Sequence, residues 1–127
     1  MTRLESDPRF ASIGRSDWIR FAADACRIAV RDSGLDDERV GAALRALEQT
    51  ELDADIATSM RERSDRLDEE AWDAEARGAD DRYVVLFRRS RAASALAFAL
   101  AGEPGEAIYE AAFALTQPED LIRRLGA

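Results

Sequence analysis

The chain has 127 residues, of which 46% are hydrophobic, and it carries a formal net charge of −8 with no histidine and a single cysteine. This length fits one domain with a substantial core, whereas the lack of histidine removes the usual general base and the commonest metal ligand. Ser–His–Asp and Cys–His catalytic systems are therefore excluded in their ordinary form, and one cysteine forms neither an internal disulfide nor a thiolate zinc site.

The negative charge is concentrated in one segment of the chain. Residues 51–81 contain twelve carboxylates and four arginines, an excess equal to the whole net charge of −8, while acids and arginines balance elsewhere. All 18 basic residues are arginine, whose planar guanidinium group pairs well with carboxylates. This distribution favours a basic partner and disfavours nucleic acid, because the net negative charge repels phosphate groups.

The first third of the chain predicts a helix after an irregular start. Residues 1–14 are expected to form a loop or a short turn, and Ser16 is the expected N-cap of a helix that Gly34 ends. Apolar residues recur along this helix at steps of three and four, which indicates one buried face. They are Trp18, Phe21, Ala22, Ala25, Cys26 and Ala29. Cys26 is accordingly expected to be a buried, unreactive thiol.

A short second helix is predicted after the stop at Gly34. Asp36 or Asp37 is expected to cap it, because a side-chain carboxylate accepts hydrogen bonds from the free N–H groups of a first turn. Its apolar positions fall on one face, which is the pattern of a helix that packs against a core. These positions are Val40, Ala43, Leu44 and Leu47.

The acidic segment predicts a long third helix that ends at Gly78. Thr50 with Asp53 resembles a capping arrangement at its start, and a break near residues 59–64 is left open. The helix has a thin apolar stripe in which Arg63 occupies one place, and its other positions are mostly charged. The stripe consists of Leu52, Ile56, Met60, Leu67, Ala71 and Ala74.

The rest of the chain predicts two further helices and a short final one. Asp80 and Asp81 begin a fourth helix, where their charge suits the positive end of the helix dipole. Residues 102–105, Gly-Glu-Pro-Gly, form a turn before a fifth helix over 106–115, and Pro118 suits the first turn of a short sixth helix. The whole chain is therefore predicted to be one all-α domain, a bundle of five or six helices.

The acidic third helix carries the strongest candidate for a functional surface. Four of its carboxylates step by three or four residues and so share one helix face. A tryptophan lies beside them, and an exposed aromatic residue among carboxylates is suited to anchor a protein interface. We therefore expect an outward strip that binds a basic protein partner. Its residues are Glu62, Asp65, Glu69, Trp72 and Asp73.

The same helix allows a metal-binding alternative. Glu62 with Asp65, and Glu70 with Asp73, both fit an E-x-x-D pattern, and carboxylates at this spacing can hold Mg²⁺ or Mn²⁺. All-helical nucleotide pyrophosphohydrolases use such pairs on facing helices, so a metal-dependent hydrolase of nucleotides or phosphate esters is the enzymatic alternative. No E-x-x-E pair lies within another predicted helix to face these residues, and the favoured interpretation has no metal, no cofactor and no catalytic residue.

A basic group precedes the apolar run of the fourth helix. Arg82, Arg88, Arg89 and Arg91 would suit a phosphate or carboxylate ligand, because guanidinium groups bind such anions bidentately. The favoured interpretation is internal, with these arginines paired to the acidic third helix that precedes them. The apolar run at 92–101 is too short to cross a membrane, which needs about 20 residues, so no membrane partner is expected.

Alanine-rich helical segments recur at 21–26 (FAADAC), 91–100 (RAASALAFAL) and 107–112 (AIYEAA). In order and composition they resemble segments of small all-α immunity proteins from bacterial polymorphic toxin systems. The resemblance implies a cytoplasmic protein that neutralises a toxin by binding it. We therefore expect a non-enzymatic bacterial protein-binding module. A structural homodimer, favoured by the small residues on several helices, is a further alternative.

Overall fold

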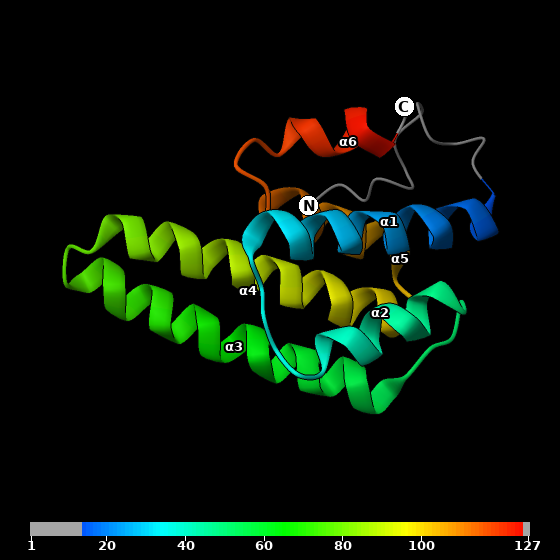
Figure 1. Ribbon diagram of the computed structural model, residues 1–127, viewed down its shortest axis with the longest axis horizontal. Coiled ribbons are helices and arrows are strands. Elements are labelled where there is room, and N and C mark those ends of the chain that lie inside the picture. Colours follow the sequence, from blue (N-terminus) through cyan, green and yellow to red (C-terminus); the bar gives the residue numbers. More distant parts are fainter. Residues whose placement is uncertain (1–13, 126–127) are drawn as a thin grey trace.

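The computed structural model describes residues 14–125, which form six helices and no strand (Figure 1). The prediction of an all-α bundle is therefore confirmed, whereas the loop expected at 1–14 lies, except for its last residue, outside the described residues. No described helix combines the length and the apolar character needed to cross a membrane. The helices are α1 (Arg15–Ser33), α2 (Val40–Glu48), α3 (Ala54–Ala76), α4 (Asp80–Leu100), α5 (Pro104–Phe113) and α6 (Glu119–Leu125).

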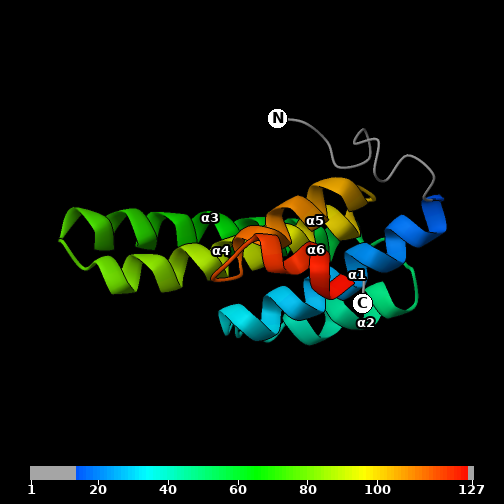
Figure 2. The ribbon, with the colours of Figure 1, turned by 90° about the horizontal axis from the view of Figure 1, so that it is seen from above.

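A long antiparallel hairpin of α3 and α4 runs along most of the length of the molecule. α1 and α5 pack against α4, α2 lies beside the base of the hairpin, and α6 lies against α1 and α5 (Figures 1 and 2). The far half of the hairpin extends beyond the other helices and ends at the turn around Gly78. We call residues 69–87, which lie within this half, the distal hairpin.

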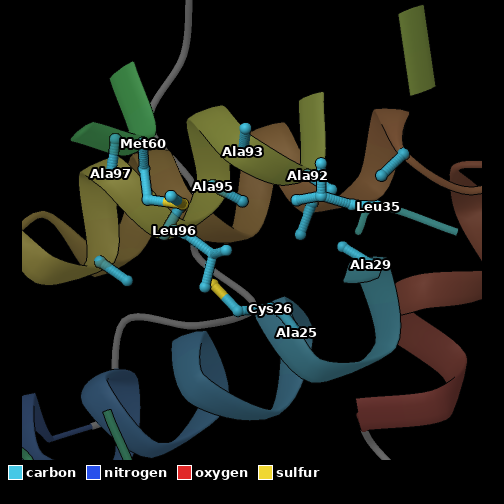
Figure 3. Close-up of a cluster of buried hydrophobic side chains, with 14 of the residues drawn as sticks. Ala25, Cys26, Ala29, Leu35, Met60, Ala92, Ala93, Ala95, Leu96 and Ala97 are labelled. Carbon is cyan, nitrogen blue, oxygen red and sulfur yellow. The ribbon is translucent and has the colours of Figure 1, made fainter. Parts of the chain in front are cut away.

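Alanine dominates the buried interface between α1 and α4. Figure 3 shows Cys26 and Ala29 of α1 directed toward Leu96 and Ala92 of α4, and all four residues are buried. Small side chains let the helix axes approach closely, and Met60 of α3 fills space that alanines leave. The apolar stripe predicted on the first helix therefore does form part of the core.

The buried stripe of α3 differs from the prediction at two places. Ser64, not Arg63, takes the missing position, and its hydroxyl lies 3.1 Å from the hydroxyl of Ser90 on α4. Arg63 instead reaches toward Asp37, with Nε 3.4 Å from the carboxylate. Leu52 lies before the helix and is 67% exposed. α3 runs without the break considered in its middle, since a small serine lets it continue straight past α4.

Three helix starts also differ from the prediction. Gly14 and Arg39 occupy the N-cap positions of α1 and α2 without a side-chain bond, so α1 begins ahead of the expected Ser16 cap. Asp37 does not occupy the N-cap position itself. Its carboxylate accepts a 2.9 Å hydrogen bond from the N–H of Arg39, the N-cap residue, in the turn before α2. α5 begins at Pro104, whose missing N–H is harmless in a first turn.

Four residues of the described chain place the backbone in the left-handed region, each just after a helix. Three are glycines, Gly34, Gly78 and Gly102, with φ of 72°, 77° and 85°. The stops predicted at Gly34 and Gly78 are therefore confirmed. The fourth is Thr50, with φ of 54°. A β-branched side chain is strained in this region, whereas glycine is not.

Thr50 closes α2 instead of capping α3. The N–H of Glu51 donates to the carbonyl of Ala46 at 2.9 Å, which is the long hydrogen bond of a Schellman motif, and Thr50 takes the position where that motif favours glycine. The N-cap of α3 is Asp53, whose carboxylate accepts a 3.0 Å hydrogen bond from the N–H of Ile56. The predicted capping pair is thus divided between two helices.

Replacing Thr50 by glycine is expected to raise the free energy of unfolding by about 1 kcal/mol, because glycine adopts this φ without strain. Gly78→Ala is the matched opposite change. A Cβ at Gly78 would meet no atom within 4 Å, so only backbone strain acts there, and stability should fall by a similar amount. Chemical denaturation measures both. A less stable Thr50→Gly protein would show that the threonine side chain contributes more than the strain removes.

Candidate functional site

The predicted partner-binding strip lies on the outer face of α3. Leu67 and Ala71 of the same helix are buried against the bundle, and the strip lies on the opposite side. Trp72 is 63% exposed, which is a high value for a residue that is usually well covered. We call this surface the acidic strip. It comprises Glu62, Asp65, Glu69, Trp72 and Asp73, and each of these side chains is exposed.

Most carboxylates of the acidic strip form no ion pair with another described residue. Asp73 pairs with Arg77 at 2.9 Å, but both side chains are exposed, so water weakens their attraction. The side chains of Glu62, Asp65 and Glu69 form no hydrogen bond or ion pair with another described residue. The strip therefore presents a negative potential to solvent beside an exposed aromatic ring.

The carboxylates of the metal-binding alternative are spread along α3. Glu62, Asp65, Glu70 and Asp73 are all exposed. Since a helix rises 1.5 Å per residue, the first and last of them lie about 16 Å apart along the axis. Within residues 14–125, no group of three or more cysteine, aspartate or glutamate side chains is placed to hold a metal ion. The hydrolase alternative therefore has no ligand cluster in the described structure.

A partly buried ion network joins α3, α4 and α5. Arg91 of α4 donates from Nη2 to Asp68 of α3 at 2.9 Å and from Nη1 to Glu110 of α5 at 3.0 Å. Ser90 donates to Asp68, and Ser94 donates to Glu110 at 3.1 Å. The three charged side chains are 16–22% exposed, so solvent screens their attraction less than it screens a surface pair.

Two further arginines of α4 bind the ends of other helices. Arg88 donates to the carbonyl of Asp32 at 2.6 Å, near the end of α1, and to the carbonyl of Ala114 at 2.8 Å, just after α5. Arg89 donates to the carbonyl of Ser33 at 3.3 Å. The last carbonyls of a helix lack partners within it and carry the negative end of its dipole, so these cations stabilise both helix ends.

The basic group therefore divides into three roles. Pairing with the acidic third helix is confirmed for Arg91, through Asp68, but Arg88 and Arg89 bind carbonyl groups instead. Arg82 is exposed and forms no bond with another described residue. Helix phase explains the difference, because neighbouring residues of α4 point to different sides. Three of the four guanidinium groups are thus already engaged inside the fold.

Cys26 lies in the core between α1 and α4. The residue is fully buried, and Figure 3 shows it directed toward Leu96. Burial raises the pKa of the thiol to about 12, and the charge of Arg27 opposes this rise only in part. Because the thiolate is the reactive form, a thiol with this pKa stays unreactive at neutral pH, and the predicted burial is confirmed.

No protein-family model, curated protein or solved structure matches the chain. The resemblance to immunity proteins therefore stays a prediction from the sequence. The features that bear on function are the side chains that the fold leaves at its surface, above all the acidic strip and the tryptophan within it.

Arg91→Met is expected to lower the free energy of unfolding by about 3 kcal/mol, because it leaves Asp68 and Glu110 without their cation. Arg82→Met is the control, since it removes the same charge from the same helix at an exposed position. The control should stay within about 0.5 kcal/mol of the wild type. Urea denaturation of both variants gives the comparison, and equal effects would contradict a structural role for the network.

The buried thiol predicts a loss of stability at alkaline pH. The unfolded chain releases the Cys26 proton near the ordinary pKa of 9.0, whereas the folded chain keeps it until about 12. Between these values the unfolded state binds fewer protons, so the free energy of unfolding falls as pH rises, by about 2 kcal/mol near pH 10.5. Cys26→Ala should remove this fall. Denaturation of the wild type and of Cys26→Ala across the pH range measures the difference, and parallel curves would refute the assignment.

Proposed function

We propose that this chain is a non-enzymatic bacterial protein-binding module that uses the acidic strip to bind a basic protein. The observation that carries the proposal is the division of charge on α3. Asp68 turns inward to Arg91, while Glu62, Asp65 and Glu69 are exposed and form no ion pair with another described residue. Like charges along one helix face repel one another, and a cationic surface would remove that repulsion on binding.

The two components of the acidic strip suit two different tasks. Its carboxylates would attract a positively charged partner from a distance, which raises the association rate and selects against acidic proteins. Trp72 offers a large apolar surface at low cost in side-chain entropy, which suits a contact that slows dissociation. Together these features favour recognition of a protein rather than of a small molecule.

The concrete version that we favour is a cytoplasmic immunity protein that binds a cationic toxin. The resemblance in the alanine-rich segments supports this version, and the negative charge of the strip suits a toxin with a basic surface. A homodimer formed through the same face is disfavoured, because it would place two rows of unpaired carboxylates against each other.

Reversal of two charges tests the proposal. Asp65→Arg/Glu69→Arg changes two exposed residues that lack ion pairs among the described residues, so the fold should be unaffected. Affinity capture from the source cell, quantified by mass spectrometry, is expected to retain a basic protein on the wild type and about tenfold less of it on the variant. The association rate of the captured pair should fall, and its salt dependence should weaken.

A second double variant separates the position of the charge from its amount. Asp36→Arg/Glu38→Arg also reverses two exposed acids, in the loop before α2, and changes the net charge equally. It should leave capture and association rate close to the wild type. If both double variants act alike, total charge and not the acidic strip directs binding, and the proposed face is wrong.

A further inference from the structure

α5 covers one side of the hairpin near its base and stops short of the distal hairpin. Glu110 of α5 bonds to Arg91 and Ser94 of α4, and the carbonyl of Ala114, just beyond the end of α5, accepts from Arg88. Past this point Figures 1 and 2 show only α3 and α4. No other described helix therefore covers this side of the hairpin nearer the tip.

Aromatic residues continue this side toward the tip. On α4, Phe87 and Tyr83 lie one and two turns before Arg91. Their rings stack with centroids 6.0 Å apart, and the guanidinium of Arg91 lies 5.6 Å from the centre of the Phe87 ring. On α3, Trp72 lies one turn beyond Asp68, the partner of Arg91. Residues one turn apart share a helix face. Both helices therefore present aromatic residues on the side of the hairpin where Arg91 pairs with Asp68.

This surface combines two exposed side chains with two partly buried aromatic rings, and carboxylates border it. Trp72 is 63% exposed and Val84 is 50% exposed. On α3, Glu69 and Glu75 lie three residues to either side of Trp72, and on α4 the two aspartates that begin the helix lie one turn before Val84. We call this surface the aromatic side. It consists of Trp72, Tyr83, Val84 and Phe87.

We propose that the aromatic side binds an amphipathic, positively charged helix of the partner protein, which continues the line of α5 and adds a third helix to the distal hairpin. The proposal rests on the proposed function, which supplies a basic partner, and it identifies the element that docks. Apolar residues on one face of the incoming helix contact the aromatic side, and flanking lysines or arginines meet the bordering carboxylates. A second copy of the chain fits poorly, because each copy carries −8.

Two synthetic peptides of identical leucine and lysine composition test this inference by calorimetry against the full chain. One peptide carries its leucines on a single helix face, and the other disperses them around the helix. We expect the one-faced peptide to bind at least about tenfold more tightly. Trp72→Ala/Val84→Thr should lower its affinity about tenfold and leave the dispersed peptide unchanged.

Val85→Thr is the matched control. Val85 is 38% exposed and follows Val84 directly, so its side chain points about 100° away around the helix. This variant should bind both peptides as the wild type does. All the substituted side chains are exposed, and circular dichroism should show the same helix content and melting temperature within a few degrees.

The outcomes distinguish this inference from the proposed function. Equal affinity for the two peptides, with both weakened by Asp65→Arg/Glu69→Arg, overturns the aromatic side and keeps the acidic strip. Binding that ignores Asp65→Arg/Glu69→Arg overturns the proposed function and the inference that rests on it. If light scattering shows a dimer of the free chain that Trp72→Ala/Val84→Thr abolishes, the occupant is a second copy, and the inference is again overturned.

Discussion

The guanidinium group of Arg91 fixes three helices relative to one another. It lies between Asp68 of α3 and Glu110 of α5, and a planar guanidinium bonds carboxylates only in defined directions. The helix surfaces around Arg91 are rich in alanine, whose short side chains project little. Apolar packing alone would therefore fix the relative positions of the helices only weakly. A partly buried ion pair adds little stability over apolar residues of equal volume, and we infer that its main contribution here is to select one arrangement of the bundle.

Once Arg91 has set the position of α3, the rest of that helix divides by face. Asp68 turns inward, Ser64 bonds to Ser90 at the helix crossing, and the remaining acids turn outward. Most of the excess negative charge of the chain therefore lies on the surface, where it contributes little to the packing of the helices. Arg88 and Arg89 do not neutralise this charge, because they bind the ends of α1 and α5. The exposed charge is thus a consequence of how the interior arginines are used.

Helix positions and the outward placement of the acidic strip could be predicted from the sequence, because apolar periodicity reports which face of a helix is buried. Ser64 and Glu110 could not, since their roles depend on which helix faces which. A serine within an apolar stripe looks like a gap, and nothing in the sequence near Glu110 points to Arg91 on another helix. Thr50 was misassigned because the residue that closes one helix lies close to the residue that begins the next.

The distal hairpin joins the rest of the molecule at its base, where Arg88, Arg89 and Arg91 bond to α1, α3 and α5. A load applied near the tip would act on this row of arginines with the hairpin as its lever arm. Hydrogen bonds weaken steeply with small changes in distance and angle, so a tilt of the tip would weaken the hydrogen bonds of these arginines first. Mechanical force on the exposed end would thereby reach the last turns of α1 and α5, although neither helix reaches the distal hairpin.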